Sequence, residues 1–317
     1  MTRSRRIRRL ASHALRRSGR LAALVRPLLD ALAGSGLRLL LRLVRRLDRM
    51  RVSAAAASLM RALGPWLPEH RVGRANVAAA FPDKSPAQVE EILRGVWDNL
   101  GRVAVEFAYV DRLVEGDRWR RIHIDYDKDS IARFLHMRDD GKPALVFAAH
   151  LANWELPALI AAADGLDTVV LYRRPNLRSV ADAIERIRKD RMGQLVPTSV
   201  YAPVQLARAL EAGRHVAMLV DQHYGKGVEV MFFGRKCKSN PLIAILAREA
   251  ECEIYGTRVI RLPGGRFRAE VSEAITPARD ADGRIDVAGT MQAVTAVIEG
   301  WVREYPEQWL WLHRRWR

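Results

Sequence analysis

The hydrophobic positions beyond residue 140 alternate between short apolar runs and longer segments with helical spacing. The apolar runs predict strands at residues 144–149, 167–172, 216–220, 229–232 and 252–260. The periodic segments predict helices at about 177–192, 204–212 and 241–249. Pro263-Gly264-Gly265 predicts a turn that folds the last strand back onto residues 266–271 as a hairpin. This alternation is typical of the α/β class, with a mixed, largely parallel sheet flanked by helices.

The first 51 residues follow a different pattern. Leucine and valine recur at helical spacing in two stretches, near 21–32 and 40–47, and arginines occupy the other face. The segment contains fifteen Arg and two Asp, so it carries +13 of the formal net charge of +17. Its charges interrupt every run of the roughly 18 apolar residues that a membrane span needs. We expect a basic amphipathic helical segment in a membrane interface, with a nucleic-acid-binding arm or a solvated tail as alternatives.

These patterns predict three parts: residues 1–51 as the membrane-associating segment, 52–115 as a helical lead-in packed on the body, and 116–317 as the α/β domain. Within the lead-in, Ser85-Pro86-Ala87-Gln88 has the residues of a capped helix start. Cys237 and Cys252 have no metal-ligand spacing around them and are expected to be free thiols.

The candidate chemistry lies directly after the strand at 144–149. His150 follows that strand, and Asn153 can cap a helix that carries Glu155, with Pro157 in its first turn. In open α/β sheets, ligands bind outside the carboxyl ends of the strands. A carboxylate on one ring nitrogen of His150 would leave the other nitrogen as a base that takes a proton from a hydroxyl.

Other polar residues follow neighbouring predicted strands. Tyr172-Arg173-Arg174 and Asp221 stand at the ends of two strands, so they should lie near His150. Each has a plainer interpretation: Asp221 capping a turn, Arg173 and Arg174 as surface charges. For His150 and Glu155, the spacing by itself favours a histidine with one structural hydrogen bond.

The segment His150-Leu-Ala-Asn-Trp-Glu155 has the His-x4-Asp/Glu form of the glycerolipid acyltransferase superfamily. From about residue 70 onward the chain resembles the lipid A late acyltransferases, the lauroyl/myristoyl-type enzymes of that superfamily. Four further stretches carry the likeness: Arg74-Ala-Asn76 with Phe81-Pro82; Tyr172-Arg-Arg-Pro-Asn176; Asp221-Gln-His223 followed by Phe232-Phe-Gly-Arg235; and Pro306-Glu-Gln-Trp-Leu-Trp-Leu-His-Arg-Arg315. Five stretches in this order reverse the preference for a structural histidine.

The resemblance implies transfer of a fatty acyl chain from acyl carrier protein to a hydroxyl of a lipid A precursor. His150 would remove the hydroxyl proton while Glu155 orients it, without an acyl-enzyme. By the same resemblance an arginine of the helix after the Tyr-Arg-Arg-Pro motif assists catalysis, and the spacing points to Arg188 before Arg186. Further candidates for holding the oxyanion or the substrate are Arg174, Asp221, Asn153 and Arg235.

The resemblance also implies a place at the cytoplasmic face of the inner membrane, against an anionic surface. No metal or other cofactor is expected, because His-x4-Glu is not the His-Glu-x-x-His pattern that binds zinc. No nucleic-acid partner is expected, because the apolar helix faces are wide and no nucleic-acid motif follows the basic segment. Related enzymes often have a membrane span at the N-terminus, and this chain departs from that pattern. Alternative acceptors are a lysophospholipid or another glycolipid. Two other classes are a non-enzymatic membrane- or nucleic-acid-binding protein and, more remotely, a metal hydrolase.

Overall fold

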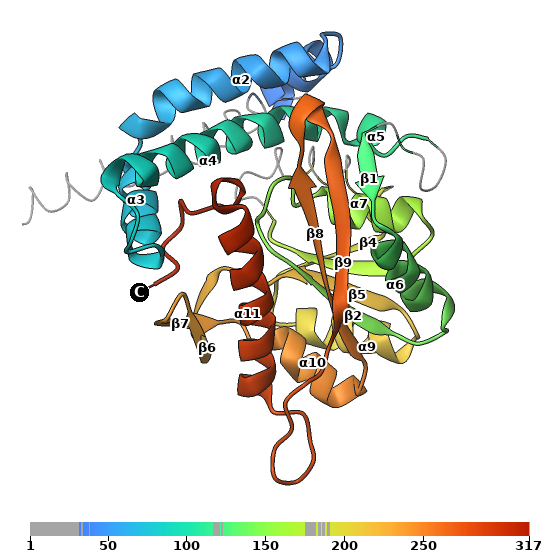
Figure 1. The fold of residues 1–317 in the computed structure, drawn as a ribbon. Helices are drawn as coiled ribbons and strands as arrows, with labels where there is room; N and C mark the ends of the chain where they lie inside the picture. Colours follow the sequence, from blue (N-terminus) through green and yellow to red (C-terminus); the bar gives the residue numbers. More distant parts are fainter. Residues whose placement is uncertain are drawn as a thin grey trace, which may run out of the picture.

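The computed structural model describes residues 32, 34–37, 39–116, 121, 123–174, 182, 185, 188 and 191–316 (Figure 1). The helices, with the short 3-10 turns marked η, are α2 (Arg49–Leu63), η1 (Gly64–Trp66), α3 (Pro68–Ala80), α4 (Pro86–Glu106), η2 (Phe107–Tyr109), α5 (Val110–Leu113), α6 (Lys128–Asp139), α7 (Leu156–Ala163), α9 (Ala202–Glu211), α10 (Leu242–Ala250), η3 (Pro263–Gly265), α11 (Val287–Glu304) and η4 (Pro306–Gln308). The strands are β1 (Ile124–Tyr126), β2 (Ala144–Ala148), β3 (Thr168–Tyr172), β4 (Gln194–Pro197), β5 (His215–Leu219), β6 (His223–Phe232), β7 (Arg235–Ser239), β8 (Glu253–Arg261) and β9 (Phe267–Ile275).

Within the described residues, seven strands form one sheet in the order β1-β9-β8-β2-β5-β3-β4. Strands β8, β2, β5, β3 and β4 run parallel, while β9 is antiparallel to β8 and parallel to β1. The predicted α/β class with a mixed, largely parallel sheet is confirmed. The predicted strand at 229–232 belongs to β6, which pairs with β7 in a separate antiparallel hairpin.

Helices cover both faces of the sheet. Since the side chains of a strand point alternately to opposite faces, each strand contributes to both layers of the core. Leu145 and Phe147 of β2 point to the face packed against α9, α10 and α11, where the Phe147 ring stacks on Trp301 with 5.6 Å between centroids. Val146, between them, points to the other face and packs with Phe134 and Met137 of α6. Helix α7 covers the same face beside β8 through Leu159 and Ile160.

The helical lead-in forms a layer across one end of the sheet (Figure 1). Helix α4 begins with the predicted capping box, in which Ser85 and Gln88 exchange side-chain and backbone hydrogen bonds of 3.3 and 2.8 Å. Helix α2 lies alongside it, and a Cβ at Gly101 would come within 2.6 Å of the Ala56 carbonyl oxygen. Only glycine therefore allows this close approach of the two helices.

The C-terminal segment lies against the residues that follow the carboxyl end of β2. Trp309 and Trp311 are fully buried, and Asn76 of α3 donates to the Trp311 carbonyl at 2.8 Å. Residues Leu151 and Trp309 form an antiparallel bridge, and the Leu310 amide donates to the His150 carbonyl at 3.0 Å. The two motifs at residues 150–155 and 306–315 are thus in direct contact.

Part of the basic N-terminal prediction falls on residues outside the described ones. The stretch at 39–44 is helical, whereas the stretch near 21–32 lies almost wholly outside. Among helices of the described residues, none is both long and apolar enough to cross a membrane.

Candidate active site

His150 and Asp221 meet at the carboxyl edge of the sheet because of strand register. Ala148 of β2 pairs with Leu219 of β5. Two residues after these paired positions come His150 and Asp221, respectively. The Asp221 Oδ1 atom lies 2.7 Å from His150 Nδ1, and its Oδ2 atom accepts the His150 backbone N–H at 2.8 Å. Since a carboxylate only accepts, the ring hydrogen is on Nδ1, and Nε2 is an acceptor that lies 3.4 Å from the Gln222 amide nitrogen.

Burial and charge act in opposite directions on this pair. Burial, the largest influence on His150, disfavours the charged ring, but the charge and hydrogen bond of Asp221 and the charge of Glu155 raise its pKa above the ordinary 6.5. Burial likewise works against the Asp221 carboxylate, while the charge and hydrogen bonds of His150 hold the pKa of Asp221 well below its usual range. The histidine is therefore a stronger base than a free imidazole.

Trp309 completes the environment of Asp221. Its indole Nε1 donates to Asp221 Oδ2 at 2.8 Å, and its ring packs edge-on against Trp311 with 4.6 Å between centroids. The carboxylate therefore accepts three hydrogen bonds, one each from the ring of His150, the backbone of His150 and the indole. This fixes both carboxylate oxygens and, through them, the direction of the His150 ring.

Glu155 has a different partner from the one predicted. It was expected to orient His150, but the carboxylate on the ring is Asp221, and Glu155 binds Arg188 through both of its oxygens. The Arg188 Nε atom donates to Glu155 Oε2 at 2.9 Å. The reason is placement: Glu155 occupies the position just before α7 starts at Leu156, and its influence on His150 is that of its charge.

The predicted helix start near Asn153 is three residues too early. Asn153 Oδ1 accepts the Glu155 N–H at 3.2 Å, but its amide nitrogen donates to the buried Glu106 at 3.0 Å. The turn between β2 and α7 is thus held by groups outside it, so α7 starts only at Leu156. Pro157 lies in the first turn, as predicted.

A cavity of about 870 Å³ opens beside His150. It extends along the sheet face that α6 and α7 cover, and His150, Gln222, Glu155 and Arg188 are among its polar lining residues. The lining is otherwise largely aliphatic and aromatic, and includes Phe134, Val146, Ala148, Ala161, Val170 and Ala217. Such a chamber suits one long apolar chain, since burial of each CH2 group stabilises by about 0.8 kcal/mol.

Two other predicted binding residues, Arg174 and Arg235, do not line this cavity. Arg174 is half exposed and pairs with Asp182 at 2.8 Å and Glu185 at 3.0 Å. Arg235 opens β7 outside the cavity lining, and its guanidinium lies over the Trp316 ring at 5.0 Å from the centroid. Arg186 lies outside the described residues. The structure thus brings together His150, Asp221, Glu155 and Arg188.

One group of three possible metal ligands occurs among the described residues, formed by His136, Asp140 and Glu253. It lies at the far end of α6 and at the amino end of β8, the end opposite to the one that carries His150. Glu253 already accepts the Tyr255 hydroxyl at 2.5 Å. This group has no connection to the chemistry beside the cavity.

Two contributions to the site were not predicted. The ring partner Asp221 was named only as a substrate-binding candidate, and Trp309 only as part of a C-terminal motif. The equal offset of His150 and Asp221 from paired strand residues was the one available signal, and it requires the strand order. Chemically, the arrangement places an oriented imidazole Nε2 where it can take a proton from a hydroxyl held at the mouth of an apolar cavity.

The fold and this site define an α/β protein in which a histidine, held by a buried carboxylate, lies beside a largely apolar cavity. Comparison with protein-family profiles matches residues 35–317, and the chain belongs to the bacterial lipid A biosynthesis acyltransferase family. This confirms the resemblance found in the sequence. A search of curated proteins gave no match. Acyl transfer in lipid A biosynthesis is therefore the activity for which the site has to account.

Proposed function

We propose that the protein transfers a fatty acyl chain from acyl carrier protein to a hydroxyl of a lipid A precursor, with His150 as general base. The observation that carries the proposal is the position of His150: Nδ1 is held by Asp221 at 2.7 Å, while the ring lines an apolar cavity of about 870 Å³. A base fixed in this way beside space for an alkyl chain has the requirements of acyl transfer to an alcohol.

In the proposed reaction, His150 Nε2 accepts the proton of the acceptor hydroxyl as its oxygen attacks the thioester carbonyl carbon. The carbonyl electrons move onto oxygen and form a tetrahedral oxyanion. When they return, the carbon–sulfur bond breaks, the thiolate leaves and takes the proton from the imidazolium, and the ester remains. No bond to the enzyme forms at any stage.

Charge in the site supports these steps. Asp221 stabilises the imidazolium that forms in the first step, as a carboxylate on the second ring nitrogen does in catalytic triads. The Arg188 guanidinium is held by Glu155 and lines the cavity, so it can stabilise the oxyanion electrostatically. The Arg188 guanidinium also lies over the Tyr172 ring, 5.9 Å from its centroid, and Tyr172 lines the same cavity.

The acyl chain itself would lie along the sheet. Ala148, Ala217 and Ala161 give the chamber small side chains at three positions, and Val146 and Phe134 lie farther from His150 along β2 and α6. The proposed donor is an acyl carrier protein, because a thioester on a long flexible arm can deliver the chain while the carrier remains outside. Mass analysis of products from matched acyl-carrier-protein and lipid A precursor mixtures tests this, with a lysophospholipid as alternative acceptor.

We also propose that the N-terminal part binds an anionic membrane surface. In the described portion, Leu39, Leu40, Leu43 and Leu47 are each about half exposed, whereas Leu41 and Val44 pack against the end of α4. The Arg45 guanidinium anchors this helix by donating to the Ala108 carbonyl at 3.0 Å. Exposed leucines on an arginine-rich helix are typical of interfacial membrane binding. The lipid substrate would then reach the cavity from that surface at the cytoplasmic face of the inner membrane.

A further inference from the structure

The turn that carries His150 and Glu155 has an unfavourable backbone. Ala152, at its centre, has φ of 45°, in the left-handed region that residues with a Cβ rarely occupy. The side chain of Ala152 is fully buried, so no solvent contact compensates. Such a conformation persists only when the surrounding structure determines it.

Groups from distant parts of the chain hold this turn on both sides of Ala152. Its N–H donates to the Gln308 carbonyl at 2.8 Å, and its carbonyl accepts from Asn99 Nδ2 at 3.1 Å. The next residue, Asn153, donates from its side chain to Glu106 Oε2 at 3.0 Å. Asn99 and Glu106 belong to α4, so the helical lead-in makes direct contact with the catalytic turn.

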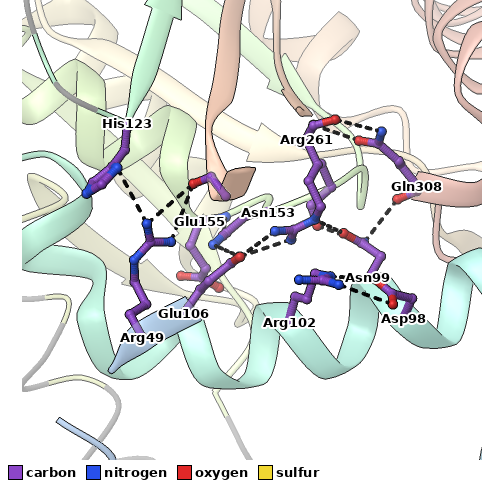
Figure 2. Close-up of polar contacts among 12 residues, drawn as sticks. Arg49, Asp98, Asn99, Arg102, Glu106, His123, Asn153, Glu155, Arg261 and Gln308 are labelled. Carbon is purple, nitrogen blue, oxygen red and sulfur yellow. Dashed lines mark hydrogen bonds and ion pairs between the residues drawn. The ribbon is translucent and has the colours of Figure 1, made fainter. Parts of the chain in front are cut away.

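One buried ion pair joins these groups (Figure 2). Glu106 and Arg261 make a two-point contact, with Arg261 Nη2 donating to Glu106 Oε2 at 3.0 Å and Nη1 to the other oxygen. The side chain of Glu106 is 1% exposed and that of Arg261 12%. Arg261 Nε also donates to Asn99 Oδ1 at 2.8 Å, which directs the amide N–H groups of Asn99 toward the turn.

Gln308 closes the network from the C-terminal motif. Its side chain exchanges two hydrogen bonds with the backbone of Arg261, of 2.8 and 3.2 Å, while its own carbonyl accepts from Ala152. Figure 2 shows these residues converging from α4, the end of β8 and the C-terminal segment on the turn. No residue of this network lines the cavity or bonds to the Nε2 atom of His150, and its link to the lining is the 3.2 Å bond from the Glu155 N–H to Asn153.

We propose that Glu106 and Arg261 are positioning residues, which act through Asn99, Asn153 and Gln308 to hold the 150–155 turn in its strained form and so aim His150 and Glu155 at the cavity. The expected loss of turnover rests on the proposed function, whereas the expected loosening of the 150–155 turn does not. It also gives the helical lead-in a role in catalysis, distinct from any contact with a membrane.

The chain supplies a matched control. Arg121 and Asp164 form an equally buried two-point ion pair, with distances of 2.7 and 3.0 Å and exposed fractions of 3% and 0%. This pair contacts neither the catalytic turn nor residues 306–310 in any interaction found. Asp164→Asn therefore removes the same kind of charge without disturbing the proposed network.

The test compares Glu106→Gln, Asn153→Ala and Asp164→Asn in the full-length protein. Hydrogen–deuterium exchange of peptides covering residues 150–156 measures the turn without requiring activity. We expect exchange there to accelerate by about 10-fold or more in Glu106→Gln and Asn153→Ala and to stay at the wild-type rate in Asp164→Asn. Asn153→Ala keeps the Glu106–Arg261 pair intact, so it reports on the turn if Glu106→Gln fails to fold.

Kinetics give the second measurement. Misplacement of a catalytic group by about 1 Å can cost roughly 10²-fold in rate, so kcat should fall 10- to 100-fold in the first two variants, with KM for the acyl donor unchanged. Unaltered exchange at 150–156 would overturn the proposal, as would equal kcat losses in Asp164→Asn. A wild-type protein without acyl transfer would overturn the proposed function instead, and the exchange result would still decide the positioning role.

Discussion

Trp309 donates its indole N–H to Asp221 at 2.8 Å, and this bond joins the C-terminal motif to the carboxylate that holds His150. The other oxygen of Asp221 is on His150 Nδ1, so the C-terminal segment and the strand-end histidine share one carboxylate. The bond explains why a tryptophan near the end of the chain belongs to the site. It also makes Asp221, rather than Glu155, the residue that sets the tautomer of His150.

Asp221→Asn should shift the pH dependence of the enzyme. Asp221 raises the pKa of His150, and only the neutral ring, present above that pKa, can accept a proton. Loss of the carboxylate charge lowers this pKa, so the acidic limb of kcat/KM should move to lower pH. The maximum rate should fall by about 10²- to 10⁴-fold, because the imidazolium loses its counter-charge. A pH–rate profile with a lower maximum rate but an acidic limb at the wild-type pH would contradict this role of Asp221.

Glu155 and Arg188 should show strong coupling. The Glu155 charge also raises the pKa of His150, so Glu155→Gln should move the acidic limb in the same direction as Asp221→Asn but less far. Arg188→Met leaves the Glu155 carboxylate unpaired in a largely buried place, and should move the limb to higher pH. In a double-mutant cycle, Glu155→Gln should remove most of the effect of Arg188→Met. Additive effects of the two substitutions would show that the pair does not act as a unit. Separately, Glu155→Asp should retain more activity than Glu155→Gln.

The cavity can be tested by filling it. Ala161 of α7 lines the chamber, whereas Ala163 on the same helix is exposed. Ala161→Phe should reduce turnover of long-chain donors relative to shorter ones, by about fourfold for each CH2 group excluded from the chamber. Ala163→Phe, the matched control, should leave the chain-length profile unchanged. A profile that Ala161→Phe does not alter would place the acyl chain elsewhere.

Membrane binding should depend on the exposed leucines. Leu43→Ser combined with Leu47→Ser should weaken binding to vesicles that contain anionic lipid, because both side chains are about half exposed, Leu43 on a basic helix and Leu47 just after its end. Added salt should weaken binding of the unaltered protein. Met231→Ser serves as control, because Met231 is a similarly exposed side chain on β6. Binding that resists both the substitutions and salt would contradict the proposed interfacial contact.

Much of the fold was predictable because its signals are local. Apolar runs gave the central parallel strands, and Ser85-Pro86 gave the start of α4. Since parallel strands end at one edge, His150 and Asp221 could be expected near each other. Strands β1 and β4 have three and four residues, too few for a periodic signal, and both were missed.

The partner choice within the site was not predictable in the same way. The sequence places Glu155 five residues from His150 and Asp221 seventy-one away, so proximity along the chain favoured Glu155. Strand register decides otherwise, because β2 and β5 are neighbours with Ala148 opposite Leu219. The Glu106–Arg261 pair was missed for a related reason: 155 residues separate its members, and each alone looks like an ordinary surface charge.

The central claim is that His150 is the base for acyl transfer. The most direct test incubates the wild-type protein and His150→Ala with an acyl carrier protein thioester and a lipid A precursor, and follows the mass of the lipid product. Circular dichroism and thermal unfolding would confirm that both proteins are folded. We expect the wild type to add one acyl chain, and His150→Ala to do so at a rate about 10²- to 10⁴-fold lower. Transfer by a folded His150→Ala at a rate within a few-fold of wild type would contradict it.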